Sequence, residues 1–124
     1  MSNELGSFKF LVCPADRRKS PAASFAQEFS DTNISYFVGV DAKETEPHAF
    51  LTGDRNLMLG RQPFLPGLLI LSNRPAMPLG WTRELHHSSG NIGMADGSVQ
   101  QLNRRKLIRA AQDQGLQTTR LAVP

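Results

Sequence analysis

Residues 86–102, HHSSGNIGMADGSVQQL, carry the pattern that decides the fold prediction. The pair Asp96-Gly97 separates two runs of strand-like composition, residues 91–95 and 98–102. Asp-Gly between such runs is a strong short-range signal for a β-hairpin, because both central positions of a two-residue turn need a positive φ angle. The stretch therefore predicts an antiparallel hairpin with Asp96 and Gly97 at its turn.

A second antiparallel hairpin is predicted upstream. Residues 35–40, SYFVGV, are rich in aromatic and β-branched side chains and predict a strand. Residues 49–52 would form its partner, with the acidic segment 41–47 as the turn between them. Residues 53–56, GDRN, combine turn-forming residues and predict the end of regular pairing.

Proline limits the strands that can form elsewhere. Residues 8–13 predict a short strand that ends at Pro14. Residues 57–80 contain four prolines, and only residues 68–72 among them are expected inside a sheet, because proline cannot donate to a hydrogen-bond ladder.

The clearest helical pattern directly follows the hairpin predicted for residues 91–102. Residues 104–114 place Leu107, Ile108 and Ala111 on one face at helical spacing. Asn103 is a favourable N-cap, and Gly115 is placed to end the helix in the left-handed conformation. Together with the strands, this predicts an α+β fold with an antiparallel sheet and a C-terminal helix.

Length and composition indicate one soluble globular domain, residues 1–124. The chain is long enough to bury a hydrophobic core, its hydrophobic content is 40%, and its net charge of +3 does not demand a nucleic-acid partner. The sequence has no apolar run of membrane-spanning length and no signal-peptide pattern at its start.

The single cysteine, Cys13, excludes an internal disulfide and a thiolate metal cluster. It lies between an apolar run and Pro14, and no base for a nucleophilic thiol is evident nearby in the sequence. We therefore expect Cys13 to be a small buried hydrophobic residue.

His86, Asp96 and Gly97 are the candidate functional residues, and a structural role is the favoured interpretation. A neutral imidazole can accept one hydrogen bond and donate another, so His86 could satisfy backbone groups at the base of the hairpin. Asp96 can accept bonds from amides in its own turn. These roles require no catalytic residue, no metal and no cofactor.

Two alternatives stay open. The first is a metal-binding module or metal-dependent hydrolase that uses His86 and Asp96, with a third ligand such as His48 or Asp54. The second is a nucleic-acid-binding module built on the basic residues of the predicted helix, which are Arg104, Arg105, Lys106 and Arg109.

Three stretches resemble one protein family. The spacing from His86 to Asp96-Gly97, within GNIGMADGSVQQL, resembles the H-x9-DG domain of pilin-like and type II secretion pseudopilin-like proteins. The stretches LVCPADRRK and ISYFVGVDAKETEPHAFLTGDRNL are similar to further segments of these proteins, so the resemblance covers most of the chain.

The resemblance implies a non-enzymatic head domain that lies outside the cytoplasm, in the periplasm or at the cell surface. Its partners would be other pilin or pseudopilin subunits, in a fibre or a secretion apparatus. Such proteins are anchored in the inner membrane by an N-terminal hydrophobic helix, and that helix is absent from this sequence. We expect a membrane attachment only through such a helix in a longer parent protein.

Overall fold

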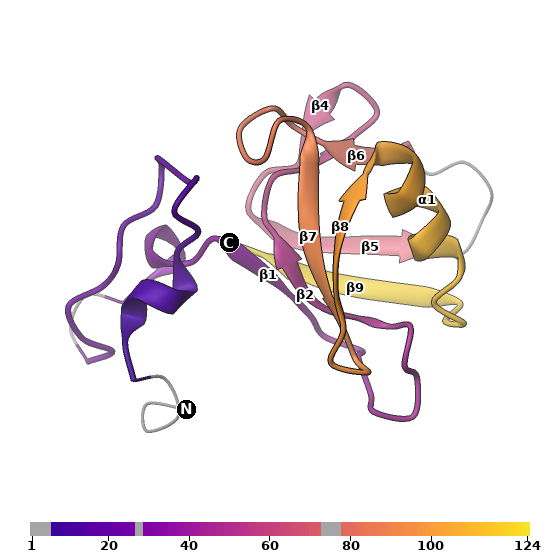
Figure 1. The fold of residues 1–124 in the computed structure, drawn as a ribbon, viewed down its shortest axis with the longest axis horizontal. Helices are drawn as coiled ribbons and strands as arrows, with labels where there is room; N and C mark the ends of the chain where they lie inside the picture. The colour runs from indigo at the N-terminus through magenta and orange to yellow at the C-terminus, as the bar shows by residue number, and fades with distance from the viewer. Residues whose placement is uncertain (1–5, 27–28, 73–77) are drawn as a thin grey trace.

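The computed structural model describes residues 6–26, 29–72 and 78–124 and shows an α+β fold dominated by antiparallel sheet (Figure 1). The main sheet has six strands in the order β5-β9-β1-β2-β7-β8, and each neighbouring pair is antiparallel. Its strands are β1 (Tyr36–Gly39), β2 (Phe50–Asp54), β5 (Gly67–Ser72), β7 (Ser89–Met94), β8 (Val99–Asn103) and β9 (Thr118–Val123).

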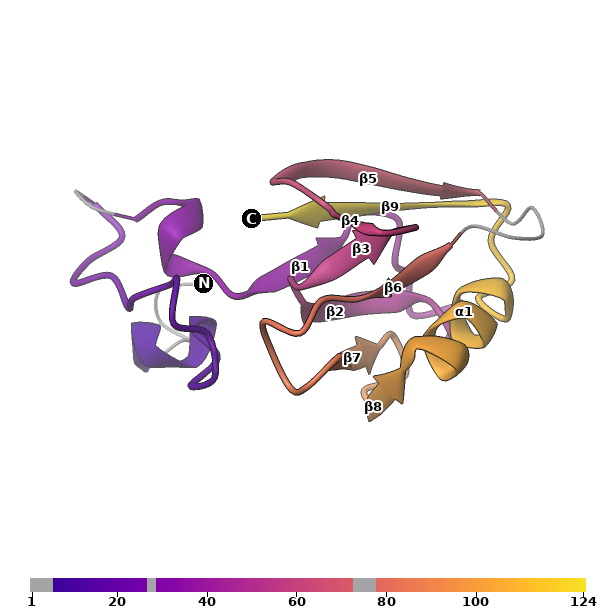
Figure 2. The same cartoon turned by 90° about the horizontal axis from the view of Figure 1, so that it is seen from above.

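A smaller sheet and one helix complete the body. The sheet contains β3 (Leu57–Leu59), β4 (Gln62–Pro63) and β6 (Leu79–Trp81) in the order β4-β3-β6. The helix α1 (Arg104–Gln112) follows β8 directly. The smaller sheet and α1 both lie on one side of the main sheet (Figure 2). One core forms between the main sheet, the smaller sheet and α1. It contains Phe37, Phe50, Leu57, Leu69, Leu71, Leu79, Trp81, Ile92, Met94, Leu102, Leu107, Leu121 and Val123.

Both predicted hairpins are present. Strands β1 and β2 pair with Phe37 opposite Gly53, and β7 and β8 pair with Gly93 opposite Val99. The turn of the second hairpin differs from the prediction, because four residues, 95–98, connect β7 to β8, and only Gly97 among them has a positive φ, of 85°. The Gly97 amide donates to the Met94 carbonyl and the Met94 amide donates to the Ser98 carbonyl. This is a turn followed by a left-handed glycine bulge, which needs glycine at one position only.

The helix begins at its predicted cap, but it ends at Gln112 with Asp113 as its C-cap, earlier than the predicted residue 114. The Asn103 side chain accepts a hydrogen bond from the Lys106 amide at 3.0 Å. Gly115 has a φ of 76°, in the left-handed region. Leu107 is fully buried, which anchors the helix to the core.

Three strand predictions were wrong. Residues 8–13 contain a 3-10 helix, η1 (Phe8–Leu11), because the Ser7 side chain caps the Lys9 amide. Residues 53 and 54 continue β2, since Gly53 leaves room for the ring of Phe37. The proline-rich segment forms β3, β4 and β6 besides β5, and Pro63 is tolerated because β4 is a two-residue edge strand.

The N-terminal segment, residues 6–26 and 29–34, lies to one side of the two sheets (Figure 1). It contains η1 and a second 3-10 turn, η2 (Asp31–Asn33). Phe8 packs edge-on against Phe25, and Phe10 is 72% exposed. Because none of the residues of the main core comes from this segment, its attachment to the sheets depends on other contacts.

Candidate functional site

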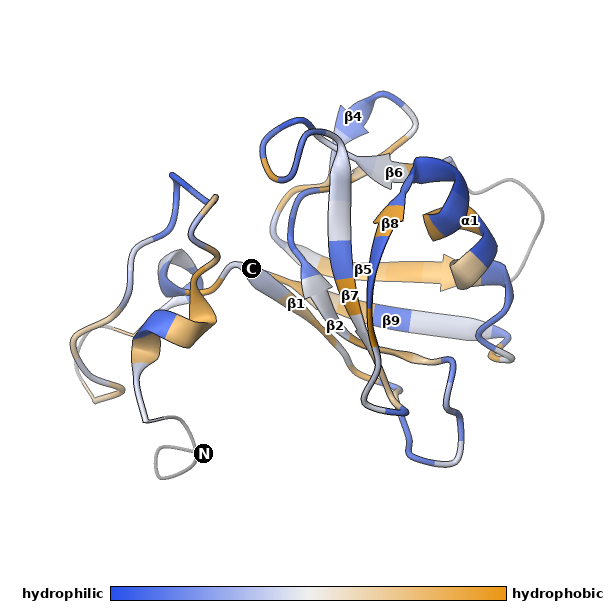
Figure 3. Cartoon of the chain, viewed as in Figure 1, coloured by the Kyte–Doolittle hydropathy of each residue, from blue (hydrophilic) through white to orange (hydrophobic). Residues whose placement is uncertain are grey.

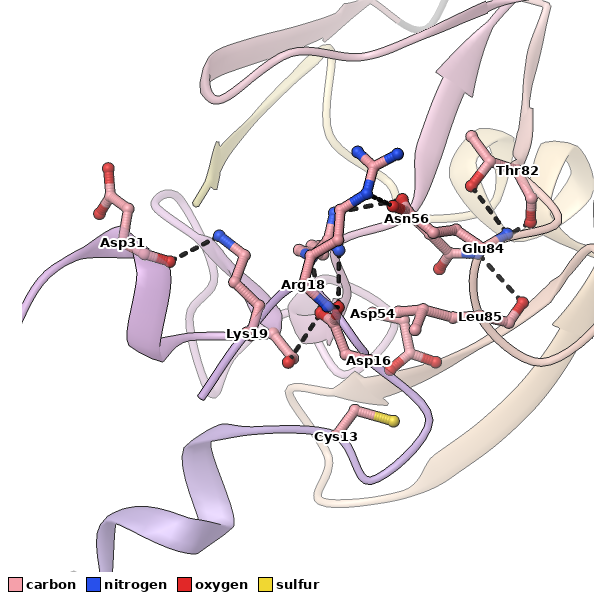
Figure 4. Close-up of polar contacts among 12 residues, drawn as sticks. Cys13, Asp16, Arg18, Lys19, Asp31, Asp54, Asn56, Thr82, Glu84 and Leu85 are labelled. Carbon is pink, nitrogen blue, oxygen red and sulfur yellow. Dashed lines mark hydrogen bonds and ion pairs between the residues drawn. The ribbon is translucent and has the colours of Figure 1, made fainter. Parts of the chain in front are cut away.

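The contacts that attach the N-terminal segment converge on the end of β2. Three consecutive residues there, Asp54, Arg55 and Asn56, direct their side chains to three different partners. Figure 4 shows the polar contacts of this region. It labels Cys13, Asp16, Arg18, Lys19 and Asp31 of the N-terminal segment, Asp54 and Asn56 at the end of β2, and Thr82, Glu84 and Leu85 before β7.

Arg55 binds the N-terminal segment through a bidentate ion pair with Asp16. The Arg55 Nε and Nη2 atoms lie 2.6 and 2.7 Å from the two Asp16 carboxylate oxygens. The Ser35 hydroxyl donates a third bond to Asp16, at 2.9 Å. Burial alone would raise the pKa of Asp16, but the bonds from Arg55, Ser35 and the Arg18 amide outweigh it and leave the pKa below its ordinary value.

Glu84 extends this pair into a network. Its carboxylate accepts from Arg55 Nη1 at 3.3 Å and forms an ion pair with Arg18. The side chain of Arg55 is only 10% exposed and that of Asp16 is fully buried, so this ion pair is shielded from solvent. Buried and partly buried ion pairs therefore contribute to the attachment of the N-terminal segment to the body.

His86 lies beside this network. Its Nε2 atom is 3.4 Å from the Cys13 thiol sulfur and 3.4 Å from Asp54 Oδ2. One ligand atom from each of Cys13, Asp54 and His86 lies within 4.8 Å of the other two. Cys13 and Asp54 are buried and His86 is partly exposed, with 25% of its side-chain surface accessible. We refer to these three residues as the Cys-Asp-His cluster.

Asp54 is the most deeply buried member of the cluster. Its Oδ2 atom accepts from the Asn91 amide at 2.6 Å and from Asn91 Nδ2 at 3.1 Å. In the part of the chain that the structure describes, no group donates to its Oδ1 atom. Burial raises the pKa of the Asp54 carboxyl above its ordinary value, and the bonds from Asn91 and the nearby His86 offset this only in part.

The loop that carries His86 has an unusual backbone. His86, His87 and Ser88 have φ angles of 46°, 53° and 66°. A left-handed conformation costs roughly 1–2 kcal/mol for each residue that has a side chain. The Asn56 amide supports this loop by donating to the Thr82 and Leu85 carbonyls at 3.0 and 3.3 Å.

The structure separates two residues that the sequence pattern connects. Asp96 lies in the exposed hairpin turn, where it accepts from the Ser98 amide at 2.8 Å as expected, and the side-chain and backbone bonds from Ser98 lower its pKa. His86 precedes β7, whose six residues span roughly 20 Å. His86 and Asp96 therefore do not meet at one ion. Of the two further ligands considered, Asp54 lies beside His86, whereas His48 precedes β2 near the turn that holds Asp96.

Cys13 was predicted to be buried, and it is 4% exposed. No base is evident near Cys13 in the sequence, but the fold brings His86 to its thiol across 73 positions of sequence. Asp54 was also misjudged as a turn residue, since it ends β2 and lies opposite Tyr36. No local sequence pattern indicates these contacts. The basic residues of α1, in contrast, are exposed and lie away from the cluster (Figure 1).

Comparisons of this chain with protein-family models, with curated proteins and with solved structures found no match.

Proposed function

We propose that this chain is the non-enzymatic head domain of a pilin-like or pseudopilin-like assembly protein and that it acts through contacts with other subunits outside the cytoplasm. The observation that carries the proposal is an apolar surface on the outward face of the main sheet. The resemblance around His86, Asp96 and Gly97 supplies the class of assembly.

The apolar surface crosses three neighbouring strands. Leu68 on β5 pairs with Ala122 on β9, which pairs with Val38 on β1. Residues opposite each other in antiparallel strands project from the same face, so these side chains form a continuous row. Leu68 is 51% exposed and Val38 is 54% exposed, which leaves the row accessible to a partner.

The strand at the edge of the sheet extends this surface. β5 has the sequence GLLILS, is apolar along most of its length and is the last strand of the sheet on its side (Figure 3). Ile70 lies on the same face as Leu68 and is 55% exposed. Edge strands of free-standing proteins commonly carry charge or proline that discourages pairing, and β5 has neither. An uncharged, apolar edge strand favours association with another chain, and the charged residue opposite Ile70 on β9, Arg120, is neutralised by its ion pair with Asp41.

A shallow groove continues the row toward the N-terminal segment. Its lining includes Ile34, Val38, Pro66 and Ala122, so it is largely apolar. A second subunit that covers the row would also fill this groove.

The geometry of the Cys-Asp-His cluster supports binding rather than turnover. In a cysteine–histidine–carboxylate triad, one ring nitrogen receives the thiol proton while the carboxylate orients the ring through the other nitrogen. Here the same nitrogen, His86 Nε2, faces both the Cys13 thiol and the Asp54 carboxylate. The arrangement therefore differs from that of such a triad.

Membrane attachment is proposed for a parent protein. Among the described residues, none of the helices is both long enough and apolar enough to cross a bilayer. We expect the parent gene to encode an apolar helix upstream of this chain. Sequencing upstream of this coding region checks that expectation, and a parent without such a helix would contradict the membrane anchor.

Cysteine cross-linking tests the subunit contact. Ile70→Cys in the full-length protein, expressed in its host, should give disulfide-linked dimers on mild oxidation, because neighbouring heads would bring two copies of the apolar surface or its edge together. The native Cys13 is buried and should contribute little background. Arg105→Cys, at an exposed position of α1, is the matched control and should stay monomeric.

A variant with a charged side chain on the apolar surface is the second test of the subunit contact. Ile70→Lys should leave the fold unchanged, because this side chain is exposed, and should abolish assembly of the full-length protein. Normal assembly of Ile70→Lys, or equal cross-linking of the two cysteine variants, would contradict the proposed role of this surface.

A further inference from the structure

We propose that Cys13, Asp54 and His86 bind one zinc ion, and that this ion fastens the N-terminal segment to the end of β2. The site differs from the metal site considered from sequence, because it uses Cys13 and excludes Asp96. It would exist whether or not the head assembles with other subunits.

The distances in the cluster suit a tetrahedral ion. Bonds of about 2.0 Å to nitrogen or oxygen and about 2.3 Å to sulfur place the ligand atoms of zinc roughly 3.3–3.6 Å apart. The thiol sulfur of Cys13 and the Oδ2 atom of Asp54 each lie 3.4 Å from His86 Nε2. Two of the three distances between ligand atoms therefore already have the required length. The third distance, between the Cys13 sulfur and the Asp54 oxygen, is within 4.8 Å.

The chemistry of the three ligand atoms selects the metal. A thiolate favours zinc over calcium or magnesium, which bind oxygen ligands almost exclusively. Imidazole nitrogen and carboxylate oxygen are both common zinc ligands. A mixed set of sulfur, nitrogen and oxygen therefore indicates zinc. The partial exposure of His86 leaves one side of the cluster from which water could complete the coordination.

Asp54 provides an independent reason to expect a cation. The residue is 1% exposed, and its Oδ1 atom has no donor among the described residues. Burying a carboxylate whose hydrogen-bonding capacity is incompletely used is costly, and a cation bound by the same carboxylate would offset the cost of burying its charge. Asn91 already fixes the orientation of this carboxylate through two bonds to Oδ2, as expected for a residue that orients a metal ligand.

The loop before β7 is built to hold His86 in place. Its three left-handed residues are costly, and the buried Asn56 side chain maintains their position by binding the carbonyls of the same loop. Backbone strain of this kind persists where the surrounding structure enforces it, and it is concentrated at functional sites. Here the strain aims one imidazole at a buried thiol and a buried carboxylate.

Zinc binding would have a defined mechanical effect. Cys13 belongs to the N-terminal segment, Asp54 to the main sheet and His86 to the loop before β7. One ion would connect all three, where the other attachments of the segment include the Asp16–Arg55 pair and the Arg18–Glu84 pair. Binding would also displace the thiol proton of Cys13, since a zinc-bound cysteine is a thiolate.

Metal titration of the full chain, purified without a histidine tag and stripped with a chelator, tests the site. We expect one equivalent of zinc to bind and the unfolding temperature to rise. Cobalt in place of zinc should produce a thiolate-to-cobalt charge-transfer band and the intense visible bands of tetrahedral cobalt. Zinc should also slow alkylation of Cys13, the single cysteine, and protect the N-terminal segment from proteolysis.

Variants assign the ligands. Cys13→Ser, Asp54→Asn and His86→Gln should each weaken zinc binding by more than the roughly 100-fold that changes around a metal ligand can reach. Asn91→Ala should weaken it by roughly 10- to 100-fold. His87→Gln is the matched control, because His87 is adjacent and has a similar backbone conformation, and it should bind zinc like the unchanged chain. Circular dichroism of each metal-free variant separates loss of binding from loss of folding.

The proposal is overturned if the folded chain binds no zinc or cobalt. It is equally overturned if binding survives in Cys13→Ser and Asp54→Asn, or if His87→Gln loses as much affinity as His86→Gln. A bound cobalt without a thiolate band would place the metal elsewhere on the chain.

Discussion

The Nε2 atom of His86 lies 3.4 Å from the sulfur of Cys13, although 73 positions separate the two residues in the sequence. The same atom lies 3.4 Å from the buried carboxylate of Asp54. The histidine that the spacing to Asp96-Gly97 singles out therefore contacts the N-terminal segment and β2 through its ring, rather than the hairpin turn. Its location explains why one residue can influence the attachment of a whole segment.

His86→Ala should lower the free energy of unfolding of the metal-free protein by about 1–3 kcal/mol, because Cys13 and Asp54 lose a polar partner in a buried setting. Urea denaturation in the presence of a chelator measures this change. His87→Ala keeps the strained loop and leaves the cluster intact, so its loss should be clearly smaller. Equal losses would mean that the loop backbone, rather than the imidazole, determines the effect.

Arg55→Ala should cost about 3–5 kcal/mol, since it leaves the Asp16 carboxylate buried without its bidentate partner. Arg55→Lys should recover only part of this loss, because an ammonium cannot bind both carboxylate oxygens in the same planar geometry. Denaturation followed by circular dichroism provides the measurement.

Arg120→Ala is the matched control for Arg55→Ala. Arg120 also binds both oxygens of an aspartate, Asp41, but this pair is exposed to solvent and should contribute far less. A similar loss for Arg120→Ala and Arg55→Ala would contradict the importance of burial for the Asp16–Arg55 pair.

The two buried aspartates should give opposite responses to pH. The pKa of Asp16 is lowered in the folded chain, so its contribution to stability is present above the ordinary value of 3.8 and is lost as the pH falls through the folded pKa. The pKa of Asp54 is raised, so its cost is absent below 3.8 and grows as the pH rises through the folded pKa.

Replacing each aspartate by asparagine isolates these contributions. Asp16→Asn should lose most stability at neutral pH and little in strong acid, whereas metal-free Asp54→Asn should gain stability relative to the unchanged chain as the pH rises. Urea denaturation across this range, with a chelator present, gives both curves. Curves of the same sign for the two variants would show that His86 and Asn91 compensate the charge of Asp54 fully.

The elements that depend on neighbouring residues could be predicted from the sequence. The two hairpins and α1 follow from patterns within about a dozen residues, Asn103 caps the helix as expected, and Gly115 has the expected left-handed conformation although the helix ends before it. β9 has no comparable local signal, and no strand was predicted there, although its pairing with β1 and β5 places it inside the main sheet. Its position depends on partners that precede it by more than forty residues.

The cluster could not be predicted for the same reason. Asp54 resembles a turn residue in the sequence, because Gly53 precedes it and Asn56 follows shortly after. The pairing of Asp54 with Tyr36, next to that of Gly53 with Phe37, keeps Asp54 within β2 and carries it toward Cys13. The thiol, the carboxylate and the imidazole come from three separate segments and become neighbours only when these segments fold together. Local sequence patterns do not predict such long-range contacts.

Gly90 makes a contact that explains its position in the motif. A methyl group added at Gly90 would lie only 2.5 Å from two atoms of the Trp81 ring, in the core between the sheets. Gly90→Ala should therefore displace this ring and cost about 1–3 kcal/mol. Trp81 is the single tryptophan, so its fluorescence should shift toward that of a more exposed indole.

A second substitution should relieve the clash at Gly90. Trp81→Phe removes ring atoms and sacrifices no hydrogen bond, because the indole N–H has no acceptor among the described residues. The pair Gly90→Ala and Trp81→Phe should then be less destabilising than the sum of the single changes, by about 0.5–3 kcal/mol. Gly93→Ala is the control on the same strand, since a methyl group there would meet only the outward-facing Thr52 within 3.4 Å. If Gly90→Ala and Trp81→Phe prove additive, the close approach of ring and backbone is not what requires glycine at this position.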